Sequence, residues 1–279
     1  MDQPNLDHWE QLADFHGRGA DHHYDVDALV TGTMQLGAEE SNALRIATHG
    51  AGVANLDVMH LQCHLGFDAI RLARDGARVT GVDFSSTALR RLDELATRCA
   101  VTVSTVEADS RDLPRQLDDS FDLVYATIGV LGWISDLDAW MSGVARALRA
   151  GGALVLVELH PLLSMVESVE PLVVNFPYSF DGGHEFSGVG SYANRDADIA
   201  WTVVEYAHGL AEVVMGAQRA GLELSYLEEH TSMRFDPRGD FELGSDGRYR
   251  LRIGAGSTVD PAVATPPMPV LYSFIARKS

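Results

Sequence analysis

Short apolar runs alternate with segments of helical periodicity through the middle of the chain. The runs that are typical of buried strands cover residues 58–61, 77–82, 101–106, 121–126 and 153–158. The clearest helical pattern lies in residues 136–149, where the apolar stripe consists of Leu137, Trp140, Met141, Val144, Ala145 and Leu148. Strands that alternate with helices in this way predict an α/β fold built on a doubly wound, mostly parallel sheet.

The same alternation continues after residue 200. Residues 201–206 alternate like a strand, and residues 208–220 have the spacing of a helix. Further strands are expected at 222–227 and 270–276. The eight candidate strands and the helices between them predict a doubly wound, Rossmann-like sheet with helices on both faces, which we expect to have seven strands.

We expect this core to span residues 51–161 and 201–279, with an N-terminal cap before it. Residues 1–50 are polar and rich in histidine, and they form the predicted cap. Helical spacing at about 25–36 and 39–49 predicts two short helices within it.

Two irregular insertions interrupt the predicted core. Residues 162–200 mix glycine, proline and aromatic residues, which leaves no room for a long helix or strand. We interpret this segment as a lid over a small apolar substrate, because structureless segments of this length are more often functional. The alternative is a surface loop packed on its own side chains. Residues 235–269 form the second irregular insertion.

Residues 58–83 predict a strand, a tight loop, a helix and a second strand that ends at Asp83. The loop covers residues 62–66, and Gly76 follows the helix where a left-handed terminator is expected. In an open parallel sheet, the loop, the helix N-terminus and the Asp83 carboxylate then surround one crevice. A carboxylate in that place can accept hydrogen bonds from both vicinal hydroxyls of a ribose.

This stretch resembles motifs I and II of the class I S-adenosylmethionine-dependent methyltransferases. The usual motif I has three glycines at alternate positions, whereas Gln62 and His64 occupy the first two here and only Gly66 matches. The run Leu-Gln-Cys-His-Leu-Gly is similar to a subgroup of bacterial small-molecule methyltransferases. A looser resemblance extends from about Tyr24 to the C-terminus. It implies S-adenosylmethionine as the cofactor, with the N-terminal cap lying over it.

The resemblance also implies a set of cofactor contacts. They are Tyr24, Gln62, Cys63, Gly66, Asp83, Phe84, Ala108, Asp109, Ser110 and Thr127. Gln62 can donate its amide to the cofactor carboxylate, or Gln62 and His64 can simply face solvent. Phe84 stands where the family packs an apolar residue on adenine, and the alternative is a core position. Asp109 stands where the family holds the adenine amine, although it can instead cap the turn at 112–114.

Composition and net charge limit the classes of molecule that this protein is expected to bind. The net charge is −19, and no basic run is present, which opposes binding to nucleic acid. Two cysteines make no disulfide framework, and the sequence contains neither a signal-peptide pattern nor a long apolar span. We therefore expect a cytoplasmic protein without a membrane segment, a monomer or homodimer, that acts on a small-molecule substrate.

A cluster of metal-ligand residue types lies in the cap. It consists of His16, His22 and His23 with Asp21 and Asp25. Nothing fixes these side chains on one helical face, and the usual spacing of Cys and His ligands is missing. We expect no metal, and we interpret the segment as a solvated part of the cap.

Methyl transfer from a sulfonium needs a nucleophile held in line, a dry site and, for some acceptors, a general base. The candidates for the base are His160, His208, His230 and His64, because neutral imidazole is basic near pH 7. His160 is placed best, just past the end of the fifth strand, and His208 is the second catalytic candidate. Alternatively, His160 only bonds nearby backbone.

Two other functions share the strand–loop–helix–strand plan. An NAD(P)-dependent oxidoreductase has the same plan, but it keeps glycines where this chain has Gln62 and His64. A non-methylating protein on the methyltransferase fold, such as a cyclase, is compatible with every residue named so far. The leading hypothesis is a methyltransferase for a small-molecule N, O or C acceptor in specialised metabolism.

Overall fold

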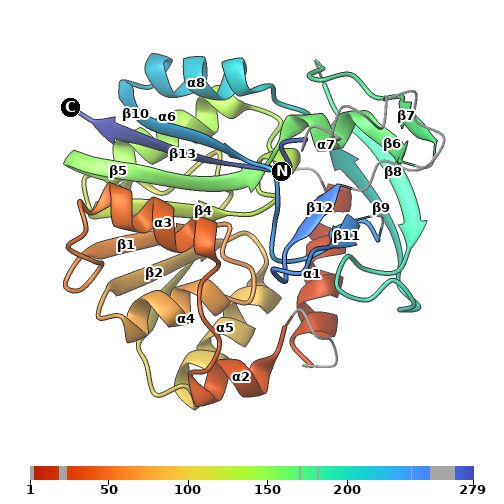
Figure 1. Cartoon of the computed structure of the whole chain (residues 1–279). Coiled ribbons are helices and arrows are strands. Elements are labelled where there is room, and N and C mark those ends of the chain that lie inside the picture. Colours follow the sequence, from red (N-terminus) through yellow and green to blue (C-terminus); the bar gives the residue numbers. More distant parts are fainter. Residues whose placement is uncertain (1–2, 19–23, 170, 181, 240, 252–267) are drawn as a thin grey trace.

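The main sheet has seven strands in the order β10–β13–β5–β4–β1–β2–β3 and forms the centre of the molecule (Figure 1). The computed structural model describes residues 3–18, 24–169, 171–180, 182–239, 241–251 and 268–279. The strands of the main sheet are β1 (Asp57–Leu61), β2 (Arg78–Asp83), β3 (Val103–Glu107), β4 (Phe121–Thr127), β5 (Leu148–Leu159), β10 (Leu222–His230) and β13 (Leu271–Lys278). The first five pair in parallel, whereas β13 runs antiparallel to β5 and β10. The predicted seven-stranded, mostly parallel sheet is confirmed.

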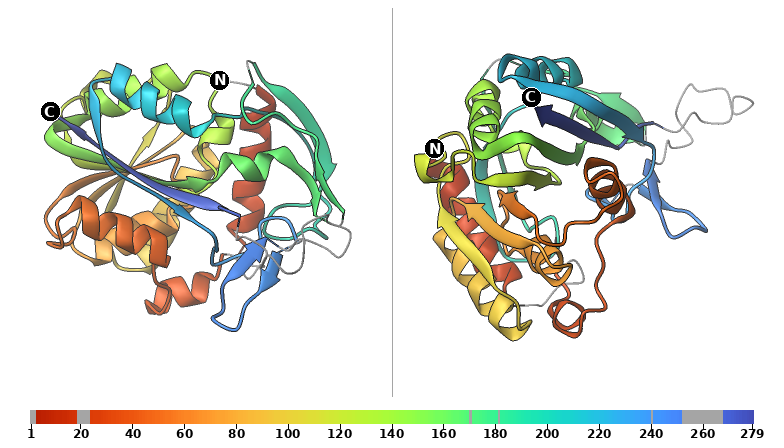
Figure 2. Two further views of the ribbon diagram at one scale, coloured as in Figure 1. Left: turned by 45° about the horizontal axis from the view of Figure 1, so that its top comes forward. Right: turned by 90° about the vertical axis from the view of Figure 1, so that its left-hand side faces the viewer.

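Helices cover both faces of this sheet (Figure 2). On one face lie α3 (Ala38–Ala47), α4 (Phe67–Arg74) and α5 (Ser86–Arg98), and on the other lie α6 (Leu137–Ala147) and α8 (Leu210–Arg219). Their apolar stripes enter two separate core clusters, one on each side of the sheet. The helices begin at side-chain caps where the sequence offers them: Ser85 caps α5 and Asp136 caps α6.

One boundary differs from the sequence pattern. The helical pattern at 136–149 and the strand predicted at 153–158 leave residues 150–152 between two elements, but β5 begins at Leu148 and contains both glycines. Leu148 already pairs with Phe121 of β4, and the register shifts before Ala153 pairs with Leu123. Gly151 takes a φ of +79° within this irregular stretch, so the glycines bend the strand rather than precede it.

The N-terminal helix α1 (Gln3–His16) is an element that the hydrophobic pattern does not predict. Its buried residues are Asn5, Leu12, Ala13 and His16, and two of these four are polar, so its apolar stripe is weak. It packs against α5 and against strand β9 (Ala200–Glu205). The second cap helix is α2 (Val26–Thr31), capped by Asp25.

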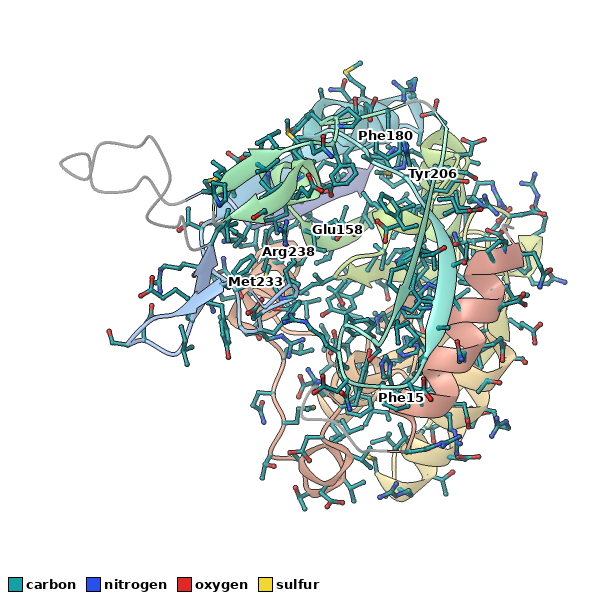
Figure 3. All side chains as sticks on the ribbon, turned by 90° about the vertical axis from the view of Figure 1, so that its right-hand side faces the viewer. Phe15, Glu158, Phe180, Tyr206, Met233 and Arg238 are labelled. Atoms are coloured by element: carbon teal, nitrogen blue, oxygen red, sulfur yellow. The ribbon has the colours of Figure 1, made fainter. Side chains whose placement is uncertain are left out.

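The predicted lid contains regular structure. Its elements are α7 (Pro161–Met165), β6 (Val166–Val169), β7 (Leu172–Val174) and β8 (His184–Val189). The strand expected at 201–206 exists as β9, but it pairs antiparallel with β8 and lies outside the main sheet. Alternation reveals a strand but not its partner, which explains the misplacement. Figure 3 shows this hairpin beside α1.

The second insertion holds a small hairpin, β11 (Phe241–Leu243) and β12 (Tyr249–Leu251). Two short 3₁₀ helices, η1 (Arg115–Leu117) and η2 (Leu131–Trp133), complete the described elements. Residues 252–267 of this insertion, and Asp21, His22 and His23 of the suggested metal cluster, lie outside the described residues.

Candidate functional site

A cavity of about 470 Å³ lies at the carboxyl ends of β1, β2 and β4. Its floor is built from the loop that follows β1, from Asp83 and Phe84 after β2, and from residues 127–130 after β4. Its cover includes Trp9 of α1 and Tyr192, which follows β8. The crevice at the carboxyl ends of parallel strands is where this class of sheet binds its ligands.

A larger hollow, about 670 Å³, lies at the opposite, amino ends of the strands. Its charged lining groups already pair with each other, because Asp57 accepts from Arg78 at 2.6 Å and from Arg149 at 2.8 Å. These ion pairs leave little for a ligand to recognise, so the cavity at the carboxyl ends is the candidate site.

The loop after β1 holds unusual backbone conformations. Gln62 and His64 have φ values of +55° and +47°, which are rare for residues other than glycine. Gly66 has φ +67°, and a Cβ there would stand 2.2 Å from the side chain of Leu92. Only glycine fits at that position, which explains why this glycine remains when the other two of the motif are replaced.

Gln62 lines the cavity and also ties the loop to the far side of the floor. Its Nε2 donates to the carbonyl of Val130 at 3.0 Å, and its Oε1 accepts from the indole of Trp140 at 2.9 Å. One amide hydrogen of Gln62 remains for a ligand. Cys63, the next residue, is buried, and burial raises the pKa of its thiol. A contact from this cysteine to a ligand would be one of packing.

Asp83 is buried and joins the end of β2 to the loop after β1. Its Oδ2 accepts from the amide of His64 at 2.8 Å, and its Oδ1 accepts from the amide of Ser85 at 2.9 Å. Burial raises the pKa of Asp83 to about 6, against the lowering effect of these hydrogen bonds. Each oxygen keeps a lone pair for a hydroxyl of a ligand.

Asp68, in the first turn of α4, is a partly buried floor residue that no sequence motif singles out. It accepts from Tyr125 at 3.0 Å and from Thr127 at 3.1 Å, and it pairs with Arg71 at 2.9 Å. Burial acts to raise its pKa, but the positive charge of Arg71 and its other partners hold the pKa below the ordinary value. The predicted contact Thr127 lines the cavity with its hydroxyl already donated to this carboxylate.

Three predicted contacts lie just beyond the cavity wall. Ala108, Asp109 and Ser110 follow β3 and are not among its lining residues. The carboxylate of Asp109 pairs with Arg111 at 2.8 Å. Burial opposes its ionisation, but the hydrogen bonds and charge of Arg111 lower its pKa to about 2. Contact between Asp109 and an adenine stays a prediction. It requires the Asp109 carboxylate to accept a hydrogen bond from the adenine while it remains paired with Arg111.

Glu158, at the end of β5, fixes the part of the floor that follows β4. Its buried carboxylate accepts from the amides of Val130 and Leu131 at 2.7 and 2.9 Å and also from that of Gly129. Burial raises the pKa of this side chain. The sequence gives no local sign of this role, because the donors lie 27 to 29 residues away.

Tyr24 and His64 contact residues that cover the cavity. Tyr24 stacks on His16 of α1, with ring centroids 4.7 Å apart, and its hydroxyl bonds that of Tyr192. His16 Nδ1 lies 3.2 Å from His64 Nε2, and His16 Nε2 lies 3.3 Å from Ser191 Oγ. The predicted cofactor residue Tyr24 therefore belongs to a network that joins the floor loop to α1 and to the lid.

The partners of Ser191 determine which groups donate and which accept in this hydrogen-bond network. Ser191 Oγ accepts from the amides of Ala193 and Asn194 at 3.2 and 2.9 Å, so its hydroxyl proton is left for His16 Nε2. Neutral His16 then carries its proton on Nδ1 and donates it to His64 Nε2. In this arrangement neutral His64 accepts at Nε2 and carries its own proton on Nδ1, and its role as a general base stays a prediction.

The other histidine candidates have partners outside the cavity. His160 caps α7, because its Nδ1 accepts from the amide of Leu162 at 3.2 Å, and its Nε2 lies 2.7 Å from Glu229. His208 bonds the carbonyl of Ile134 at 2.7 Å, and His230 bonds Ser273 at 2.7 Å. None of the three lines the cavity, so their role as a general base stays a prediction.

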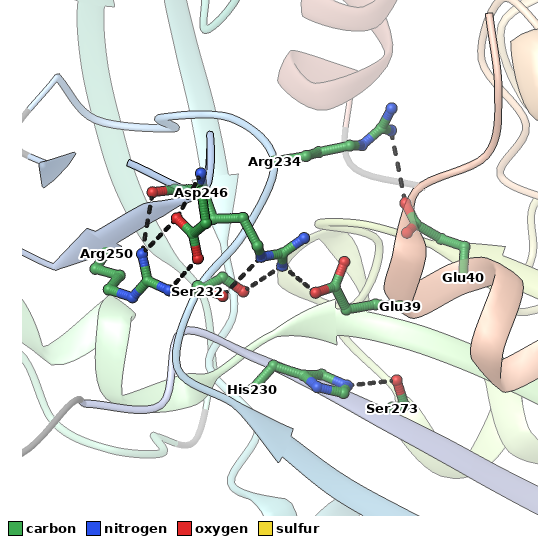
Figure 4. Close-up of polar contacts among 9 residues, drawn as sticks. Glu39, Glu40, His230, Ser232, Arg234, Asp246, Arg250 and Ser273 are labelled. Atoms are coloured by element: carbon green, nitrogen blue, oxygen red, sulfur yellow. Dashed lines mark hydrogen bonds and ion pairs between the residues drawn. The ribbon is translucent and has the colours of Figure 1, made fainter. Parts of the chain in front are cut away.

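Ion pairs attach the second insertion to the N-terminal cap (Figure 4). Arg248, in the insertion just before β12, pairs with Glu39. Arg234, one residue before the insertion, lines the cavity and lies 3.6 Å from buried Glu40. Burial raises the pKa of Glu40, against the lowering effect of Arg234. The cap and the insertion thus close one side of the cavity together.

The described residues contain no group of three or more His, Cys, Asp or Glu side chains arranged to hold a metal ion. Across the same part of the chain, every helix is too short or too polar to cross a membrane.

The fold is that of S-adenosylmethionine-dependent methyltransferases. A solved structure of such an enzyme from Mesorhizobium loti is similar, with a TM-score of 0.56, 22% identity, and coverage of 86% of this chain and 98% of that one. Residues 59–154 match the family described as Methyltransferase domain. This match spans β1 to the middle of β5, and so includes most of the cavity floor.

Two curated relatives match by sequence. An uncharacterized methyltransferase of Synechocystis is 33% identical over 139 residues, which is 48% of this chain and 63% of the relative. A cypemycin N-terminal methyltransferase of Streptomyces is 35% identical over 102 residues, which is 36% of this chain and 40% of the relative. The chain therefore spans less than two thirds of the length of either relative.

Proposed function

We propose that this protein transfers a methyl group from S-adenosylmethionine to a small-molecule acceptor, in specialised metabolism. The observation that carries the proposal is Asp83, a buried carboxylate that lines the cavity beside the loop of motif I. Each of its oxygens accepts one backbone amide and keeps a lone pair, which suits the two hydroxyls of a ribose. The cofactor would supply an activated methyl group and a good leaving group.

The residues of the floor fit such a cofactor. Phe84 lines the cavity next to Asp83 and offers an apolar surface for a nucleobase. Gln62 retains one amide hydrogen for the carboxylate of an amino-acid tail. The part of this chain is to bind, to orient and to exclude water, because methyl transfer is mainly a matter of positioning.

Two observations speak against a nicotinamide cofactor. Gln62 and His64 stand where a dinucleotide site needs bare backbone next to a pyrophosphate. The antiparallel β13 between β5 and β10 also departs from the strand order 3-2-1-4-5-6 of the dinucleotide-binding fold. Support for a small acceptor comes from the limited volume of the cavity, about 470 Å³, and support for specialised metabolism comes from the match to a relative named for cypemycin.

Calorimetric titration of the ligand-free protein tests the cofactor. We expect S-adenosylmethionine and S-adenosylhomocysteine to bind in the micromolar range and NADH not to bind. The matched variant is Asp83→Asn, which keeps the shape of the side chain but removes its charge. If neither sulfur ligand binds to a protein that melts cooperatively, the proposal is wrong.

A further inference from the structure

Four carboxylates line the cavity, and the protein provides partners for three of them. Asp68 and Asp83 have the partners described above, and Asp236 accepts from the amides of Arg238 at 2.9 Å and of Gly239 and Phe241. The fourth is Glu205, whose carboxylate has no hydrogen bond or ion pair to any described residue. Among the four lining carboxylates, it is therefore the one that a ligand can pair with.

Glu205 stands at the inward side of strand β9. Side chains alternate along this strand, and Val203 on the same side as Glu205 is 1% exposed. A carboxylate on such a face loses hydration without a compensating bond, which costs free energy unless a ligand replaces the lost water. In line with this, burial raises the pKa of Glu205.

Aromatic residues of two neighbouring elements surround this position. Tyr206 donates its amide to Gly132 at 2.9 Å, which brings Glu205 next to Trp133 of η2. Asn5 of α1 exchanges two hydrogen bonds of 2.8 Å with the backbone of Val204. Trp9 lies one turn further along α1 on the same helix face as Asn5, and so it also faces β9.

The aromatic rings form a corner. Trp9 and Trp133 stand perpendicular to each other, with centroids 5.3 Å apart, and Tyr192 lies 6.2 Å from Trp9. All three line the cavity together with Glu205. Aromatic rings that line a cavity together with a carboxylate favour a cation, because ring faces carry negative partial charge.

The lining arginines do not reverse this preference. Arg71 pairs with Asp68 at 2.9 Å, and Arg234 lies 3.6 Å from Glu40. Arg238 donates to backbone carbonyls of α7 and β6, including that of Leu163 at 3.3 Å. Among the described lining residues, the charge without a partner is therefore negative.

We propose that the acceptor is an amine that binds as an ammonium ion between Glu205 and the rings of Trp9, Trp133 and Tyr192. This inference rests on the proposed methyltransferase function, and it names the substrate class of the same cavity. The bound ammonium first loses a proton to the Glu205 carboxylate. The nitrogen lone pair then attacks the methyl carbon, an N–C bond forms, and the C–S bond breaks with its electron pair going to sulfur. The product is a methylated ammonium and a neutral thioether.

Tetramethylammonium chloride is a suitable probe, because it carries the charge and no hydrogen-bond donor. We expect it to bind saturably to the protein loaded with S-adenosylhomocysteine, whereas neutral tert-butanol does not. Glu205→Gln should weaken this binding about tenfold or more, and Trp133→Leu should weaken it as well. The control is Glu185→Gln, an exposed carboxylate on the partner strand β8, which should bind like the unmodified protein.

A separate titration keeps the two proposals apart. Glu205→Gln should bind S-adenosylhomocysteine within about twofold of the unmodified protein. A large loss there means that Glu205 faces the ammonium of the cofactor, and it overturns the amine proposal while leaving the methyltransferase intact. Equal binding of tetramethylammonium to Glu205→Gln, or no saturable binding to the unmodified protein, also overturns it.

Turnover provides a second measurement. Primary and secondary amines of small size should be methylated, and phenols and carboxylic acids of similar size should not. Glu205→Gln should lower kcat/KM for amines at least tenfold without lowering the melting temperature, since the variant removes a partly buried charge that lacks a partner. Methylation of phenols alone would contradict the proposal.

Discussion

The floor and the cover of the cavity differ in how they satisfy their polar groups. On the floor, Asp68, Asp83 and Glu158 each accept hydrogen bonds from the protein, mostly from backbone amides. On the cover, Trp9 and Tyr192 meet other rings, and Glu205 has no partner among the described residues. The floor is organised before any ligand arrives, whereas the cover leaves contacts for the ligand to complete.

This difference suits an enzyme with a constant and a variable ligand. A cofactor shared by many enzymes benefits from rigid loops whose geometry is set in advance. An acceptor that differs from one enzyme to the next is recognised by side chains on less regular segments. Substitutions in the two regions should therefore separate cofactor binding from acceptor binding.

The largest effect is expected for Gly66→Ala on the floor. Its φ of +67° and the 2.2 Å approach to Leu92 leave no space for a methyl group. We expect a loss of about 2–4 kcal/mol in the free energy of unfolding, measured by denaturant titration, together with loss of S-adenosylhomocysteine binding. The matched control is Gly182→Ala, which also has positive φ but no atom within 4 Å, and it should cost about 1 kcal/mol.

The next effect is on cofactor affinity at Asp83. Asp83→Asn should weaken S-adenosylhomocysteine binding about tenfold or more, because it removes a charged acceptor of two hydroxyls. With a pKa of about 6, the side chain of the unmodified protein is mostly protonated at pH 5.5, so affinity should fall about fourfold between pH 7.5 and 5.5. The variant should lack this fall, and a fall that persists would assign it to another group.

A rise in pH acts on stability through Asp83 in the opposite direction to its effect on cofactor affinity. The pKa of folded Asp83 is raised from 3.8 to about 6, so the folded state holds the proton more tightly than the unfolded state does. The contribution to stability is present below about pH 4 and is lost as the pH rises through 6 in the ligand-free protein. A bound cofactor should flatten this dependence, since it favours the charged form.

The floor was predictable from the sequence because its parts are local. The loop at residues 62–66, its terminal glycine and the carboxylate after the second strand follow one another along the chain, and the order of the elements predicts where they meet. Asp83 and Phe84 line the cavity, and their contacts with a cofactor stay predictions. The roles of Glu158 and Asp68 were not predictable, because their hydrogen-bond donors come from strands or loops that lie 27 to 59 residues away in the sequence.

The cover was not predictable because its signals are weak or ambiguous. Helix α1 buries only four residues, two of them polar, so periodicity does not reveal it. Glu205 ends an alternating strand, and alternation alone gives no sign that this strand faces a cavity instead of joining the main sheet. Trp9 and Trp133 meet at 5.3 Å although 124 positions separate them in the sequence.

A smaller effect should loosen the cover and spare the floor. Asn5 holds β9 through two hydrogen bonds of 2.8 Å, and it is 4% exposed. Asn5→Ala should cost about 1–2 kcal/mol, since it leaves buried backbone groups without a partner. Tetramethylammonium binding should weaken, while S-adenosylhomocysteine binding stays within about twofold. The exposed Gln3 of the same helix supplies the control variant Gln3→Ala, which should change neither.

The smallest effect is expected for His160, where the contacts favour a structural role over the predicted catalytic one. Its Nδ1 caps α7, so His160→Ala should cost about 1 kcal/mol, and His160→Asn, which restores a capping group, should recover most of it. Turnover should follow stability in both variants. A general base would show a different pattern, because kcat would then collapse in His160→Asn although the helix cap is restored. That result would place the imidazole at the acceptor and would require the end of β5 to move towards the cavity during turnover.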